Sequence, residues 1–168
     1  MKFIILALCV VAAAADPHWM MMDATEVASV KHTWDTVKHS EVDILYNIFK
    51  AYPSIMAKFP LFVGKDLEAL KDTAAFATHA GRIVGFFGEY ITLLGKQDTQ
   101  PAIKTLLNEM GMNHKNRGIP KEEFNNFRTA VMAYLKLHGD GYNAHYFDDV
   151  FDKMYFVVFS ALDGHPVA

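Results

Sequence analysis

Apolar residues recur at intervals of three and four positions over most of this 168-residue chain. Val27, Val30, Trp34 and Val37 form one such stripe, and similar stripes continue towards the end of the sequence. This spacing places apolar side chains on one face of an α-helix. No segment shows sustained alternation of apolar and polar residues, and no Asn-Gly or Asp-Gly pair joins two alternating runs. The sequence therefore predicts an all-α protein with six or seven helices.

Helix-start residues divide the stripes into separate helices. Asp23 and Glu26 match the capping-box pattern, and Ser40 and Asn143 stand where two further helices are expected to begin. Proline is favoured at the first helical position and marks three more starts, at Pro53, Pro101 and Pro120. We expect the longest helix over about residues 73–94. Residues 58–64 contain a proline and a glycine that interrupt the helical pattern.

The first fifteen residues match a secretory signal peptide. Lys2 precedes an unbroken apolar run over 3–11, and small residues then lead to an expected cleavage site after Ala15. The run is nine residues long, whereas an anchor across a bilayer needs about 20. We therefore expect a signal peptide at 1–15 and one secreted domain at 16–168. Within this domain, residues 16–22 are expected to form a loose lead before the first helix. An N-terminal helix packed in the core is the alternative.

Composition excludes several classes of protein. Cys9 is the only cysteine and would leave with the signal peptide, so the mature chain has no disulfide, cysteine nucleophile or zinc–thiolate site. The 16 basic and 19 acidic side chains are nearly balanced, and no basic run favours a nucleic-acid partner. The chain also has no Gly-rich phosphate loop, His-Glu-x-x-His pair or Gly-x-Ser-x-Gly elbow.

Two of the eight histidines fall on apolar stripes. His79 belongs to the series Phe76, His79, Ile83, Phe86 and Tyr90, and His114 follows Leu107 and Met110 in the same spacing. A buried imidazole must satisfy two ring nitrogens, and an iron atom or its bound gas would satisfy one of them. A hydrogen bond to a backbone carbonyl would serve equally well. The residues alone leave this choice open.

Three segments resemble the globin family. Residues 52–62 resemble the globin turn in which a proline precedes a haem-packing phenylalanine by six positions, here Pro53 and Phe59. Residues 78–87 resemble the globin distal helix, and residues 113–120 resemble the proximal histidine with the corner after it. Together with the secretory leader, these segments make the chain similar to the extracellular haemoglobins of chironomid midge larvae.

The resemblance implies a globin fold, with six to eight helices packed around a haem pocket. It also implies a haem b cofactor with its iron bound by His114 as proximal ligand. His79 would be the distal residue beside O₂, and Ile83 would crowd the gas site. Phe59 would stack on the porphyrin, with Phe62 behind it. Five further residues are implied as haem contacts, namely Ile119, Phe124 and Phe127 on the proximal side and Arg82 and Arg117 as partners of the propionates. Arg82 would alternatively point into the distal pocket.

The interval of 35 residues between the two histidines is longer than is usual in the globins of this group. We expect the additional residues in the loop 95–100 or at the start of the next helix. A surface connection tolerates such an insertion.

The implied function is reversible O₂ transport or storage in extracellular haemolymph. CO and NO would be further ligands, nucleic acid and membrane would not be partners, and the protein would be a monomer or a homodimer rather than an enzyme. One alternative is a haem-dependent NO dioxygenase or peroxidase-like activity, which would need a partner reductase. Another is a haem-free secreted helical protein for ligand binding or storage.

Overall fold

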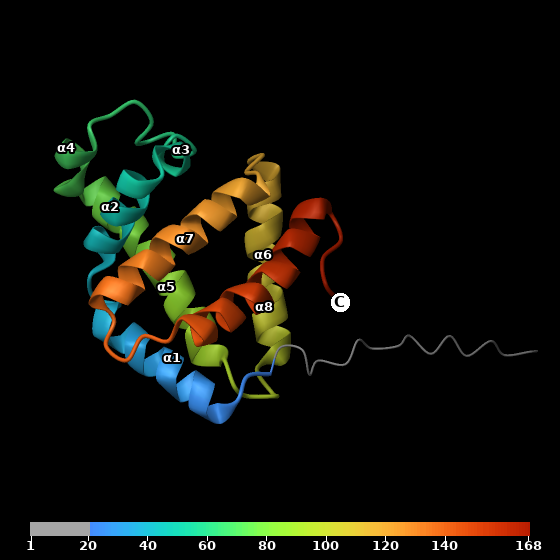
Figure 1. Ribbon diagram of the computed structural model, residues 1–168. Helices are drawn as coiled ribbons and strands as arrows, with labels where there is room; N and C mark the ends of the chain where they lie inside the picture. The colour runs from blue at the N-terminus through green and yellow to red at the C-terminus, as the bar shows by residue number, and fades with distance from the viewer. Residues whose placement is uncertain (1–20) are drawn as a thin grey trace, which may run out of the picture.

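The computed structural model describes residues 21–168, and its regular structure in that range is entirely helical. The predicted all-α class is therefore confirmed. The signal peptide predicted at 1–15 lies outside the described residues. Eight helices follow one another in chain order (Figure 1): α1 (Ala24–Val37), α2 (Glu41–Ala51), α3 (Pro53–Met56), α4 (Leu67–Lys71), α5 (Ala74–Leu93), α6 (Gln100–Asn116), α7 (Lys121–His138) and α8 (Ala144–Asp163).

Polar side chains begin two of the long helices as the sequence predicts. Asp23 accepts a hydrogen bond from Thr25 N at 2.7 Å, and Glu26 accepts one from Asp23 N at 3.1 Å, which completes the capping box of α1. Asn143 accepts from the second residue of α8 at 3.0 Å. Ser40 differs, because it occupies the N-cap position of α2 without a capping bond from its side chain. Ser40 is therefore at the predicted start of the helix, but its side chain does not cap it.

Helix α4 was not predicted from the sequence. It has five residues, which is too short for a repeating apolar pattern, and Leu70 is its one buried side chain. Polar contacts attach it to α2 instead. The hydroxyl of Tyr46 donates to the carboxylate of Glu68, and Lys71 Nζ lies 3.2 Å from Asp43 Oδ1.

The end of the N-terminal lead is packed rather than loose. The side chain of Met22 is buried against the core with 6% exposure. The neighbouring Met21 accepts a hydrogen bond at its sulfur from Gln100 Nε2 at 3.3 Å. The lead is therefore anchored to the first turn of α6, and the prediction of a loose segment is wrong for these two residues.

Helices α6 and α8 approach each other closely at a glycine. A Cβ atom added at Gly111 of α6 would lie 2.7 Å from the Cβ of Ala161 and 2.7 Å from the carbonyl oxygen of Val158. Only glycine allows the two backbones to come this near. Helices α6 and α8 pack together more extensively than any other pair of helices in the described range, and this interface sets the position of α6 (Figure 1).

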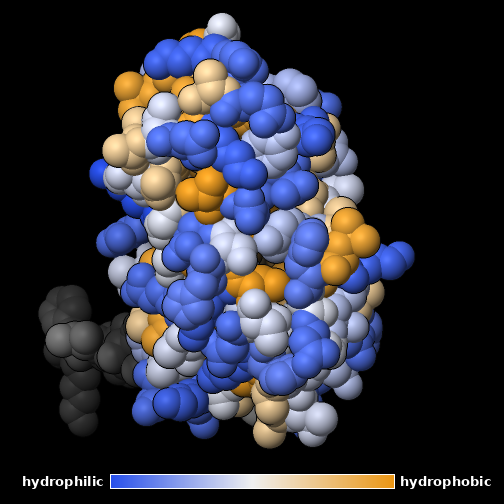
Figure 2. Space-filling view, turned by 90° about the vertical axis from the view of Figure 1, so that its left-hand side faces the viewer, coloured by the Kyte–Doolittle hydropathy of each residue, from blue (hydrophilic) through white to orange (hydrophobic). Residues whose placement is uncertain are grey.

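The visible surface is predominantly hydrophilic. Figure 2 shows one face of the molecule, on which apolar residues occur as separate spots among polar ones. None of the helices in the described range combines the length and the apolar character required to cross a membrane.

We predict that Gly111→Ala lowers the free energy of unfolding by about 1–3 kcal/mol, because the new methyl group overlaps the backbone of α8. The matched control is Gly85→Ala in α5, where the added Cβ has no atom within 4 Å. That change should raise the free energy of unfolding by up to about 1 kcal/mol, because alanine is the better helix former. Denaturant unfolding measures both, and equal effects would contradict the close packing of α6 on α8.

Candidate functional site

The two stripe histidines lie on different helices, at ends that diverge. His79 is in the second turn of α5 and His114 is in the last turn of α6. The loop 94–99 joins the other ends of these helices, and from there α5 and α6 spread apart (Figure 1).

The ring of His114 is held in one orientation by its own helix. Its Nδ1 lies 2.8 Å from the carbonyl oxygen of Met110, one turn earlier. A carbonyl only accepts hydrogen bonds, so Nδ1 carries the proton and donates it, and Nε2 keeps its lone pair. Phe124 touches the ring edge-on with the centroids 5.2 Å apart. A histidine that ligates a metal has this arrangement, with one nitrogen fixed by a carbonyl and the other free to bind.

Burial and nearby positive charge lower the pKa of both histidines, which favours the neutral imidazole at neutral pH. Burial is the largest cause that lowers the pKa of His114, and Arg117 lowers it further, while the bond to Met110 acts in the opposite direction. Burial also lowers the pKa of His79, followed by the positive charges of Arg82 and Arg117. Arg117 therefore acts on both imidazoles. A neutral imidazole is the form that binds a metal.

Two phenylalanines pack against His79. Its ring centroid lies 5.5 Å from that of Phe59 and 5.1 Å from that of Phe62, both with edge-to-face geometry. Phe62 is completely buried, whereas Phe59 is half-buried and stacks on Phe62 with 5.9 Å between the rings. Phe62 thus contacts both Phe59 and His79. Its place behind Phe59 in a haem site stays a prediction. Stacking of Phe59 on a porphyrin stays a prediction.

The residues around the two histidines are apolar but only half-buried. On α5, Phe76 and Tyr90 are fully buried, while the middle of the stripe, His79, Ile83 and Phe86, remains half-exposed. The same holds on the facing segments for three large apolar side chains, Met110, Ile119 and Phe127. Half-exposed apolar side chains gathered in this way are typical of a ligand or partner site. A flat apolar group with a central metal fits these residues, because it would cover the apolar surface and take the free Nε2.

The globin family model matches residues 42–162. The chain belongs to the globin family. Globin CTT-X of Chironomus thummi thummi is 57% identical over 152 residues, covering 89% of this chain and 100% of that protein. Globin CTT-VI of the same midge is 50% identical over 166 residues, covering 98% and 100%.

Solved structures agree with this assignment. A haemoglobin component (TA-VII) from Tokunagayusurika akamusi superposes with a TM-score of 0.82 at 49% identity, covering 87% of this chain and 99% of the other. The hexa-coordinate haemoglobin of Drosophila melanogaster superposes with a TM-score of 0.73 at 27% identity, covering 83% and 94%. This globin is thus similar over nearly its whole described length to insect haemoglobins.

The remaining predicted site residues of this globin fall into two groups. Phe124 is buried and touches His114, and the backbone N–H of Ile119 donates to the carbonyl of His114 at 3.1 Å, which closes the end of α6. Arg82 and Arg117 are exposed, and neither forms an ion pair within residues 21–168. Two exposed cations next to the half-buried apolar surface suit an amphiphilic ligand with anionic groups.

Sequence reasoning did not assign a role to Met110 or to Phe86. Met110 acts through its backbone carbonyl, and its place four residues before His114 is the available signal, because carbonyl i and side chain i+4 share one face of a helix. Phe86 was recognised as part of the α5 stripe, but only the structure shows that it is half-exposed beside Ile83.

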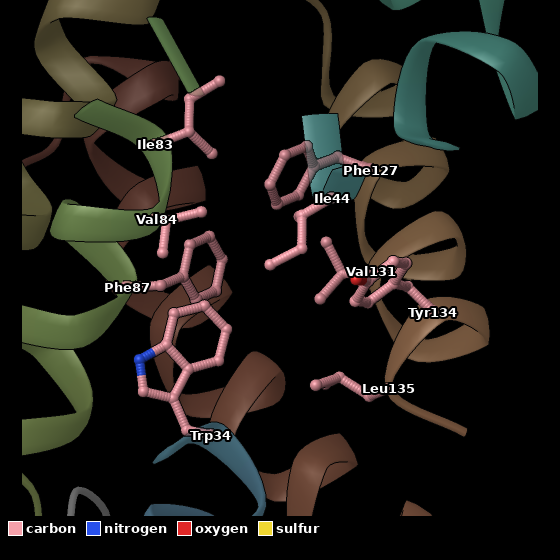
Figure 3. A pocket seen from close by; sticks show the side chains of 9 residues that line it. All are labelled: Trp34, Ile44, Ile83, Val84, Phe87, Phe127, Val131, Tyr134 and Leu135. Carbon is pink, nitrogen blue, oxygen red and sulfur yellow. The ribbon is translucent and has the colours of Figure 1, made fainter. Parts of the chain in front are cut away.

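A small apolar cavity lies behind this surface (Figure 3). It has a volume of about 10 Å³, and Ile83 and Phe127 form part of its wall. The other lining residues are Trp34, Ile44, Val84, Phe87, Val131, Tyr134 and Leu135. Space of this size holds about one water molecule and no larger organic ligand. This cavity is therefore too small to hold a haem-sized cofactor.

We predict that the haem-free chain loses stability as the pH falls below about 6.5. Both stripe histidines have a folded-state pKa below the usual value of 6.5, so the unfolded chain takes up protons first and the free energy of unfolding decreases as the pH falls through the folded pKa. His114→Phe should reduce this dependence, because it removes one of the two half-buried imidazoles whose pKa is lowered. Denaturant unfolding between about pH 7.5 and pH 5 measures it. An unchanged slope for His114→Phe would show that burial does not disfavour its charge.

Proposed function

We propose that this globin binds haem b and reversibly carries or stores O₂ in extracellular fluid, with His114 as the proximal ligand. The observation that carries the proposal is the hydrogen bond from His114 Nδ1 to Met110, which leaves Nε2 as the free nitrogen. The family of the chain and its insect haemoglobin relatives support the choice of haem as the metal group. These relatives also favour O₂ carriage over catalysis.

Haem supplies an iron atom that takes a protein nitrogen on one face and O₂ on the other. The chain contributes the apolar enclosure. Phe59, Ile83 and Phe86 would cover the distal side, and Ile119 and Phe127 the proximal side, so that each half-buried side chain becomes fully covered. Exclusion of water by these side chains favours the ferrous state that carries O₂.

His79 would stabilise O₂ in the distal pocket through a hydrogen bond from Nε2–H. Its lowered pKa keeps the ring neutral, with one N–H donor, and its edge contacts with Phe59 and Phe62 restrict the plane of the ring. A hydrogen bond to an acceptor with partial negative charge is worth on the order of 1–3 kcal/mol.

Arg82 and Arg117 would pair with the haem propionates. Both are exposed, and the charges of both lower the pKa of His79. The charge of Arg117 also lowers the pKa of His114, so it acts on both imidazoles. The alternative placement of Arg82 inside the distal pocket would bring a cation to the gas instead. The same site would accept CO and NO.

Export of the mature chain, residues 16–168, into the haemolymph is part of the proposal. It is supported by the signal-peptide pattern at 1–15 and by similarity to midge globins. The absence of nucleic-acid and membrane partners, and a monomeric or homodimeric state, remain predictions.

We predict that His79→Leu raises the O₂ dissociation rate of the haem-loaded protein by roughly 5- to 150-fold and speeds its autoxidation, because the distal hydrogen bond is lost. Stopped-flow displacement of O₂ by CO measures the rate. The control His145→Leu replaces an exposed histidine on α8 and should leave the rate unchanged. If His79→Leu releases O₂ at the wild-type rate, His79 is not the distal donor; if the wild-type protein binds no O₂, the proposed function is wrong.

A further inference from the structure

The last residues of the chain turn back along the helix that carries His114. Helix α8 ends at Gly164, which reverses the chain with a left-handed φ of 93°. The N–H of His165 then donates to the carbonyl of Ser160 at 2.8 Å and closes the turn. Val167 is half-buried and packs against the core. We call residues 164–168 the C-terminal strap; it is visible beyond the end of α8 in Figure 1.

Two side chains of α6 bond to the strap, and a third lies against it. Asn108 makes two hydrogen bonds with the backbone of Val167, donating from Nδ2 to the carbonyl at 2.8 Å and accepting at Oδ1 from the N–H at 3.0 Å. Lys104 Nζ donates to the backbone oxygen of Ala168 at 2.5 Å. At the reversal, Lys115 Nζ lies so near Gly164 that a Cβ added there would overlap it.

These contacts lie on one stripe of α6. Lys104, Asn108, Gly111 and Lys115 are spaced by four, three and four residues, so they share a face of the helix. The stripe that carries Met110 and His114 is offset by one residue, or about 100° around the axis. The strap and α8 therefore fix α6 along the flank of its ligand face, over the turns that orient the imidazole.

Asn108 is suited to this contact by its chemistry. A primary amide offers one acceptor and two donors, so a single side chain can pair with both the N–H and the C=O of one residue. An aspartate in its place would keep only the acceptor, and a leucine of similar size would keep neither group. Two substitutions at this position therefore weaken the contact by steps. Asn108→Asp removes the donor alone, and Asn108→Leu removes both groups.

We propose that the C-terminal strap, acting through Asn108, pre-orders α6 so that His114 is in place before haem binds. The inference rests on the proposed function, in which His114 is the proximal ligand. A helix that is already ordered loses less conformational freedom on binding, and its ligand is bound more tightly. Asn108 is a positioning residue, since it acts on the haem site through the helix and not by contact.

Hydrogen exchange of α6 in the haem-free full-length chain tests the strap without any haem. Amides in the second half of α6 should exchange at least about tenfold faster in Asn108→Leu and in a chain lacking residues 166–168, with Asn108→Asp between these and wild type. Amides of α1 and α2 should be unaffected. The control Glu109→Leu changes the next, exposed residue and should leave exchange in α6 as it is. Unchanged α6 exchange in both strap variants, or an equal increase in every helix, would overturn the proposal.

Transfer of haem to a scavenger globin supplies the second readout. Haem release should be at least about fivefold faster in Asn108→Leu than in wild type or Glu109→Leu. Faster α6 exchange without faster haem release would overturn the link between the strap and the haem site. A wild-type chain that binds neither haem nor O₂ would contradict the proposed function. In that case hydrogen exchange in the haem-free chain would still test whether the strap orders α6.

Discussion

The hydrogen bond from His114 Nδ1 to the carbonyl of Met110 is the interaction on which the rest of the site depends. It selects the tautomer, sets the ring plane and leaves Nε2 as the one nitrogen available to a metal. It exists only while residues 110–114 are helical, because it links a carbonyl to the side chain one turn later. The last turns of α6 must therefore stay helical. The hydrogen bond from Ile119 N–H to the carbonyl of His114 and the packing of Gly111 against α8 both stabilise these turns.

Electrostatics and burial act together in the surrounding site. Burial lowers the pKa of both stripe histidines, and Arg117 lowers it further, so the imidazoles stay neutral where a metal or a polar gas would meet them. Arg82 and Arg117, which both lower the pKa of His79, are exposed and form no ion pair with another residue in the range 21–168. An apolar interior with a cationic rim is complementary to a flat ligand that is apolar at its centre and anionic at one edge.

Much of this could be predicted from the sequence, and the failures have physical reasons. The helix starts at Asp23, Pro53 and Asn143 follow from local chemistry, and the structure confirms them. Helix α4 is too short to show a period, and the burial of Met22 depends on a long-range contact that local pattern does not contain. The stripe of α5 was predicted as one apolar face, but apolar residues look alike in sequence whether they meet the core or a ligand. The roles assigned to His79 and His114 came from resemblance to globins. Their spacing alone could not distinguish haem-site histidines from histidines buried in the core.

The most direct test of the central claim is the visible absorption spectrum of the haem-loaded protein, reduced without O₂ and then exposed to air. With His114 as the proximal ligand, the wild-type spectrum should be that of a five-coordinate ferrous haem, change to a two-banded oxygenated form in air, and return on deoxygenation. His114→Gly should lose this spectrum, and free imidazole should restore it. A spectrum unaltered by His114→Gly would contradict the account.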